Sequence, residues 1–350
     1  MIRYRPMRLR DIPECARIVA SHPTLGPRYG TEIANLSAFW RRLLANEWYF
    51  TNAVFEEVEG SRIRILGAGL AVFVSDDILQ EAKNPPSFWL GPEITRRVTR
   101  GHSPLLTEKQ VAEANSCQGV NLFVLQTGFN PEYFTRTEGT AVAATAFVEG
   151  HRGYRLKEAF VQAESVEHLA GILNFGSFLV GATNDENLGS DQLRLEQIVQ
   201  KPHLVGLTRE TVARQHGSWL ASVFVYHAPR LGFSRSEQQL LLAAMGGKTG
   251  EELSDSLSVS LSAVKKVWRT IYVRVGDNLP GLIPNQLSEE ELPQDRGKEK
   301  KRCLLAYLRE HPEELRPYSR KLMQTYPSAP GILRNRERSP RHSSLLRSTH

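Results

Sequence analysis

Residues 233–275 read FSRSEQQLLLAAMGGKTGEELSDSLSVSLSAVKKVWRTIYVRV. Three helices are predicted here, because three hydroxyl side chains that can cap a helix each precede apolar residues at helical spacing: Ser234, Thr249 and Ser260. Glutamate stands three positions after each of the first two caps, which completes a capping box in both cases. The pair Gly246-Gly247 ends the first helix, since glycine enters the left-handed backbone region without steric cost.

The third predicted helix has an apolar face and a basic face. The apolar face carries Val264, Val267 or Trp268, Ile271 and Val275. The opposite face carries Ser262, Lys265, Lys266, Arg269 and Thr270. Two short helices joined by a tight turn, the second with an apolar back and a basic front, are typical of a helix-turn-helix that enters the major groove of DNA. The alternative interpretation is a small helical bundle with a solvated basic face.

Many positions of this segment coincide with the pattern of one known family. They are Phe233-Ser234, Glu237, Leu240-Leu241, Gly247, Thr249, Glu252-Leu253, Leu257, Val259-Ser260, Val264-Lys265 and Ile271-Tyr272. In these positions the segment resembles the LuxR-type helix-turn-helix, whose pattern runs approximately L-T-x-R-E-x-x-V-L, G-x-S/T-x-x-E-I-A, L-x-I-S-x-x-T-V-K and I-Y-x-K-L. The chain departs from that pattern at Ser236, Ser254 and Ala263, where the family usually has arginine, alanine and threonine.

The resemblance implies a transcription regulator that binds double-stranded DNA as a homodimer. The residues expected to contact DNA are Ser262, Lys265, Lys266, Arg269, Thr270 and Thr249. Lysine and arginine at these positions can contact phosphates or bind guanine, and each phosphate contact adds to the salt dependence of affinity. Because Ala263 lacks a hydroxyl that could reach DNA, we expect the base preference to differ from that of the family.

The amino-terminal part, residues 1–230, is predicted to be an α+β domain. Patterns of β-branched and alternating residues predict strands over 2–8, 54–58, 63–74, 121–127 and 219–226. Helical spacing predicts helices over 12–20 and 35–44. Residues 141–148 fit a helix or a strand, and residues 155–163 are predicted to be a helix.

Residues 149–157, EGHRGYRLK, contain a glycine-bearing basic turn. With the order of predicted elements over roughly residues 1–180, this turn resembles part of a GNAT-type acetyltransferase. That family holds the pyrophosphate of acetyl-CoA on a Q/R-x-x-G-x-G/A loop that enters a helix, where glycines let backbone N–H groups close on the phosphates. The resemblance implies acyl-CoA binding at Arg152, Gly153 and Arg155. The chain departs from the pattern, because Arg155 and Lys157 stand where the next glycines are expected.

A catalytic residue is not selected by the sequence. Tyr133, Tyr154 and Glu164 are equally eligible as a general acid or base, so none is named. Ten histidines are scattered without ligand spacing, which gives no support to a metal site. We expect no resident cofactor, and acetyl-CoA is the one that the GNAT resemblance would allow.

The rest of the chain is predicted from composition. The fold class expected is an α+β, GNAT-like domain over 1–230, an all-α LuxR-type helix-turn-helix domain over 231–280, a linker with short helices over 281–330, and a basic, disordered tail over 331–350. The linker is assigned to the charged stretch 287–302, with helices over 301–309 and 319–325.

Composition also limits the compartment and the partners. The formal net charge of +6 is compatible with a polyanionic partner. The three cysteines form no CxxC pair, which favours a reducing, cytoplasmic compartment, and no run of about 18 apolar residues predicts a membrane span.

Three hypotheses about function remain open at this point. The first is a DNA-binding regulator whose GNAT-like domain senses a small-molecule ligand or mediates dimerisation. The second is an N-acyltransferase that uses acetyl-CoA and has an accessory DNA-binding domain. The third is an interaction protein whose basic face has lost its role. The incomplete loop over 152–157 favours the first over the second, and the intact basic face favours the first over the third.

Overall fold

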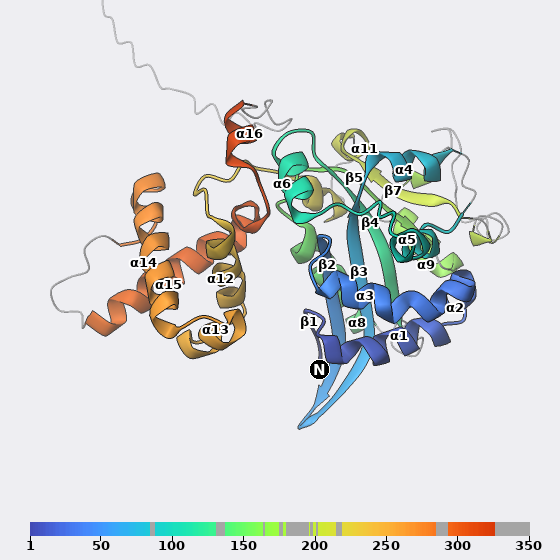
Figure 1. Cartoon of the computed structure of the whole chain (residues 1–350), viewed down its shortest axis with the longest axis horizontal. Coiled ribbons are helices and arrows are strands. Elements are labelled where there is room, and N and C mark those ends of the chain that lie inside the picture. Colours follow the sequence, from blue (N-terminus) through green and yellow to red (C-terminus); the bar gives the residue numbers. More distant parts are fainter. Residues whose placement is uncertain are drawn as a thin grey trace, which may run out of the picture.

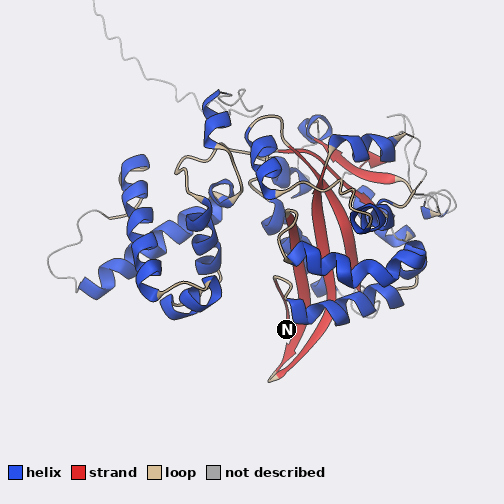
Figure 2. Cartoon of the chain, viewed as in Figure 1, coloured by secondary structure: helices blue, strands red, loops and turns tan. Residues whose placement is uncertain are grey.

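The computed structural model describes residues 1–84, 88–130, 137–163, 165–174, 178–179, 196, 199–200, 202–214, 219–284 and 293–325. The chain forms a sheet region up to residue 224 and a helical module over residues 231–325 (Figure 1). The two parts have separate hydrophobic cores. The expectation of mixed α and β structure is confirmed, and the strands lie in the sheet region alone among the described residues (Figure 2).

One mixed sheet of seven strands runs through the sheet region. Its strands stand in the order β1 (Ile2–Arg5), β2 (Phe50–Glu59), β3 (Arg62–Val74), β4 (Val120–Phe129), β5 (Leu156–Gln162), β7 (Leu204–Thr208) and β6 (Phe178–Leu179). Neighbouring strands are antiparallel except β4 and β5, which are parallel. A parallel pair needs a crossover connection, and α8 (Thr137–His151) lies in this one.

Side chains of the strands alternate between two cores, one on each face of the sheet. In β3, Leu70, Val72 and Val74 belong to the first core, whereas Ala71 and Phe73 belong to the second. The first face is covered by α1 (Ile12–Ser21), α2 (Leu25–Tyr29), α3 (Leu36–Leu44), α4 (Asp76–Lys83) and α5 (Leu90–Thr99), with short 3-10 helices at η1 (Leu9–Asp11) and η2 (Gly30–Asn35). The second core includes residues of α6 (Glu108–Ser116), α8, α11 (Arg209–Ala213) and η3 (Trp219–Phe224). Helix α9 (Val166–Asn174) lies against β7.

The helical module contains one core that extends beyond the three predicted helices. Its elements are α12 (Arg235–Met245), α13 (Gly250–Leu257), α14 (Leu261–Asn278), α15 (Pro293–Glu310), η4 (Pro312–Leu315) and α16 (Arg320–Thr325). The three predicted caps are confirmed, since Ser234, Thr249 and Ser260 each accept a hydrogen bond from a backbone N–H in the first turn. The core includes Leu304 and Leu308 of α15, so this helix packs against the other three.

Most predicted elements of the sheet region are confirmed, but two predictions there and one in the helical module are wrong. Residues 156–162 form β5 rather than a helix, because they pair with β4 on one side and β7 on the other. Residues 219–224 form a 3-10 helix rather than a strand. The predicted linker is helical from Pro293, where α15 begins. The basic tail predicted over 331–350 lies outside the described residues.

Candidate functional site

The basic face of α14 brings together five of the residues expected to contact DNA. All five side chains are exposed: Ser262, Lys265, Lys266, Arg269 and Thr270. On the opposite side, Val264, Ile271 and Val275 are buried in the core of the helical module. The two faces predicted for this helix are therefore confirmed.

The three cations of this face are not engaged by the protein itself. Within the described part of the chain, no carboxylate lies within ion-pairing distance of Lys265, Lys266 or Arg269. The neighbouring hydroxyls make local bonds, since Thr270 Oγ1 donates to the carbonyl of Lys266 at 3.2 Å. The positive charge of the face is thus open to an external anion.

A tight turn sets the position of α14 relative to α13. Ser258 has a φ of 53°, which is the left-handed conformation that ends α13. Ser254 Oγ donates to the carbonyl of Val259 at 2.5 Å and so satisfies a carbonyl of the turn. Ser254 is one of the departures from the LuxR-type pattern, and the structure gives its hydroxyl a structural role.

Thr249, the sixth residue expected at DNA, lies at the start of α13. Its side chain is exposed, and its hydroxyl accepts from the backbone N–H of Glu252 at 3.2 Å. The Glu252 carboxylate accepts in return from the backbone N–H of Thr249 at 2.8 Å. Thr249 is therefore a helix cap on a neighbouring helix, and its hydroxyl keeps its O–H donor for a partner such as a phosphate oxygen.

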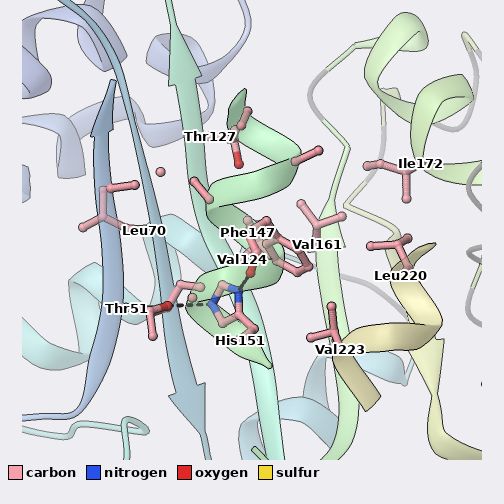
Figure 3. A pocket seen from close by; sticks show the side chains of 18 of the residues that line it. Thr51, Leu70, Val124, Thr127, Phe147, His151, Val161, Ile172, Leu220 and Val223 are labelled. Atoms are coloured by element: carbon pink, nitrogen blue, oxygen red, sulfur yellow. Dashed lines mark hydrogen bonds between the residues drawn. The ribbon is translucent and has the colours of Figure 1, made fainter. Parts of the chain in front are cut away.

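A second candidate site is a cavity of about 440 Å³ in the sheet region, between the sheet and α8. Its wall includes residues of β2, β3, β4, β5, β7, α8, α9 and η3. Figure 3 shows Phe147 and His151 of α8 on one side, with Val161, Leu220 and Val223 opposite. The sequence reasoning did not predict this cavity, because its wall comes from elements far apart along the chain.

His151 is the central polar residue of this cavity (Figure 3). Its Nδ1 lies 2.7 Å from the carbonyl oxygen of Phe147, which can only accept, so Nδ1 carries the proton. Its Nε2 lies 2.6 Å from the hydroxyl of Thr51 and therefore accepts from it. Burial lowers the pKa of His151 to about 4, so the ring is neutral near pH 7.

The residues expected to bind acyl-CoA lie after the last turn of α8. Gly153 has a φ of +85°, and a Cβ added there would lie 2.7 Å from the carbonyl carbon of Pro312. The carbonyl of Arg152 accepts from Arg316 Nε at 2.8 Å. The Arg155 guanidinium lies 5.9 Å from the ring centroid of Tyr226. The expectation that this turn enters a helix is wrong, since β5 follows it, and its glycine faces another part of the chain.

Of the three residues eligible as an acid or base, the structure describes Tyr154. Its side chain is fully buried, and its hydroxyl lies 2.8 Å from that of Tyr49. Burial raises the pKa of Tyr154. Tyr133 and Glu164 lie outside the described residues.

Residues 136–141, most of which form the start of α8, agree with the Q/R-x-x-G-x-G/A pattern at more positions than residues 152–157 do. Residues 136–141 read Arg136-Thr137-Glu138-Gly139-Thr140-Ala141, which agrees with Q/R-x-x-G-x-G/A at all three specified positions. The helix entered by this segment is α8, and Gly139 is buried in its first turn. The sequence contained this signal, but it could not be preferred until the positions of β4 and α8 were known.

Strand β4 extends beyond its parallel neighbour on the side of this segment. Pairing with β5 begins at Val120 and stops at Val124, which stands opposite Val161. Strand β4 continues to Phe129, and Gln126 and Thr127 form part of the cavity wall. The cavity therefore reaches the end of β4 from which the chain leads into α8.

Comparisons with known proteins leave the family of this chain open. No protein-family model matches the chain, and no curated protein matches it. In the described ranges, no group of histidine, cysteine or carboxylate side chains could hold a metal ion, and no helix is long and apolar enough to cross a membrane.

We predict that Gly153→Ala destabilises the protein by at least about 1 kcal/mol, because alanine is strained at positive φ and its Cβ would meet the 312–313 backbone. Gly150→Ala is the matched control, since it lies in α8 with open space around its Cα, and it should be neutral or stabilise by up to about 1 kcal/mol. Urea unfolding of both variants checks this. Equal free energies of unfolding would contradict the close contact at Gly153.

Proposed function

We propose that this chain is a DNA-binding transcription regulator of the LuxR helix-turn-helix type, controlled by its GNAT-like amino-terminal domain. The observation that carries the proposal is a set of cations on the exposed face of α14 that have no ion-pair partner among the described residues: Lys265, Lys266 and Arg269. They lie on a helix that follows a tight, capped turn and presents its apolar side to a core. A helix of this kind can enter the major groove and bind phosphates and base edges.

The position of α14 supports this proposal. The helix lies on the side of the helical module that is away from the sheet region, so the sheet region does not cover its outer side (Figure 1). A homodimer that places two such helices on inverted half-sites is part of the proposal.

Control by the amino-terminal domain is supported by contacts at the end of α8. Arg316 donates to the carbonyls of Glu149 and Arg152, each at 2.8 Å, and its guanidinium lies 4.8 Å from the ring centroid of Tyr154. The last carbonyls of a helix have no donor within the helix, so Arg316 satisfies groups that the sheet region leaves open. A displacement of α8 would therefore alter the hydrogen bonds that Arg316 of the helical module makes to it.

The segment that contains Arg316 is linked to the rest of the helical module by the buried carboxylate of Glu314. Glu314 accepts from the backbone N–H groups of Arg230 and Leu231, at 2.7 Å and 3.0 Å, and from the Tyr307 hydroxyl at 3.3 Å. Burial raises the pKa of Glu314, although the two backbone bonds oppose that shift. Residues 313–316 thus join α15, the connection at 230–231 and the end of α8.

A second candidate function, an N-acyltransferase that uses acetyl-CoA, is favoured by a different observation. The parallel pairing of β4 with β5 stops at Val124, and α8, the next described element after β4, begins at Thr137 within the Arg136–Ala141 sequence. The first turn of α8, with Gly139, would hold the pyrophosphate through backbone N–H groups. Arg152, Gly153 and Arg155 do not fit this role, because Gly153 is packed against residues 312–313.

We predict that Lys265→Ala with Lys266→Ala weakens DNA binding by at least about tenfold and lowers the salt slope of the affinity by about 2, because two phosphate contacts are lost. The measurement is fluorescence anisotropy over a salt series, on a duplex selected from a random pool by the full-length protein. Lys298→Ala with Lys300→Ala on α15 removes the same charge and should leave the slope unchanged. A slope equal to that of the unmodified chain in the first variant would contradict the groove placement.

Coupling between the two parts is tested at Arg316. We predict that Arg316→Ala increases amide hydrogen exchange over residues 148–156 by about tenfold, because two charge-assisted hydrogen bonds are lost at the end of α8. Arg309→Ala, an exposed residue of α15, is the control and should leave that exchange unchanged. Unchanged exchange in the Arg316 variant would show that the contact does not support α8.

The acyltransferase hypothesis is tested with acetyl-CoA. If it holds, acetyl-CoA raises the midpoint of thermal unfolding, Arg136→Ala abolishes the shift, and Arg152→Ala preserves it. If only the Arg152 variant loses the shift in the unfolding midpoint, the acetyl-CoA site lies at residues 152–157 instead. A chain that acetyl-CoA does not stabilise, and that does not acetylate a panel of amines, would eliminate this candidate.

A further inference from the structure

We infer that the cavity beneath α8 binds an uncharged, largely apolar small molecule that presents an N–H or O–H donor to Thr51. This inference deepens the proposed function and rests on it in one respect, since such a molecule would be the signal that the amino-terminal domain senses. Binding to the cavity is nevertheless measurable without DNA.

The size of the cavity fits a small organic molecule. Its volume of about 440 Å³ lies in the range of ligand pockets, which span roughly 300–1,000 Å³. An apolar cavity of about 150 Å³ is enough to hold benzene, so this one accommodates a considerably larger ligand. Secondary structure lines the cavity on both sides, with α8 on one side and β5 with η3 on the other (Figure 3).

The described lining of the cavity is uncharged and largely apolar. Aliphatic and aromatic side chains dominate it, among them Leu70, Val124, Phe147, Val161, Leu220 and Val223. Among the described residues that line the cavity there is no aspartate, glutamate, lysine or arginine. Because moving an unpaired charge from water into such a site is strongly unfavourable, the site discriminates against carboxylates and ammonium groups.

The two histidines in the wall do not change this conclusion. Both ring nitrogens of His151 are engaged, Nδ1 as donor to Phe147 and Nε2 as acceptor from Thr51. Burial lowers the pKa of His168 to about 4, as it does for His151, and the charge of Arg28 acts in the same direction. Both rings are neutral near pH 7, so neither supplies a cation for an anionic ligand.

The polarity of the required ligand group follows from Thr51. A hydroxyl has one hydrogen, and that of Thr51 is directed to His151 Nε2 at 2.6 Å rather than to the Ala71 carbonyl at 3.5 Å. The Thr51 oxygen, which belongs to the lining of the cavity, therefore keeps acceptor capacity only. A ligand satisfies it with a donor, whereas a ligand that offers only acceptors leaves it unpaired.

Four probes of equal chain length test charge and hydrogen bonding separately: octanamide, N,N-dimethyloctanamide, octanoate and octylammonium. Calorimetry on the full-length protein near pH 7 should give octanamide an affinity at least about tenfold higher than either ion, because only the ions lose hydration of a charge. N,N-dimethyloctanamide should bind several-fold more weakly than octanamide, since it has no N–H. An ion that binds as tightly as octanamide, or the absence of binding by all four, would overturn the inference.

Variants of the lining residues test whether octanamide binds in the cavity. Ala144→Leu fills part of the wall and should weaken octanamide binding by about tenfold, whereas Thr145→Leu, at an exposed position of the same helix outside the lining, should not. Thr51→Val should remove the preference for octanamide over its dimethyl derivative, and Thr51→Ser should restore it. A Thr51→Val protein that keeps the preference would disprove the role of this hydroxyl. Since no DNA is present, these results are independent of whether α14 binds a duplex.

Discussion

The parallel pairing of β4 with β5 is the constraint on which the sheet region depends. Parallel neighbours cannot be joined by a tight turn, so the chain must leave the sheet after β4 and return through a crossover. That crossover contains α8, whose Phe147 and His151 face the sheet across the cavity (Figure 3). The cavity, its neutral histidine and the segment that enters α8 are all consequences of this one connection.

The carboxyl end of the same helix is where the two parts of the chain meet. A helix leaves its last carbonyls without intrahelical donors, and Arg316 of the helical module donates to two carbonyls at this end of α8. Glu314, two residues earlier, is buried and binds the backbone of Arg230 and Leu231. The helix that covers the cavity is therefore completed by the part of the chain that carries the basic face of α14. Under the proposed function, this arrangement is the physical route by which occupancy of the cavity biases DNA binding.

Local sequence patterns predicted the helical module better than the sheet region. Ser234, Thr249 and Ser260 cap their helices through bonds that span three residues, so the signal and its cause lie in the same short window. Local patterns did not predict that α15 begins at Pro293, because residues 293–302 are mostly charged. Leu304 and Leu308, further along the helix, hold it in the core. Residues 156–162 form a strand only because β4 and β7 lie on either side of them.

The sequence by itself determined where the helices of residues 233–275 begin and which face of α14 is basic, because capping and helical periodicity act between near neighbours. Only the tertiary structure decided which glycine-bearing segment follows β4 and which one packs against residues 312–313. It also decided that His151 is neutral and that an uncharged cavity lies beside it, since burial and the Thr51 contact bring together residues 100 positions apart. Properties that depend on long-range contacts and desolvation are not encoded in any short window of the chain.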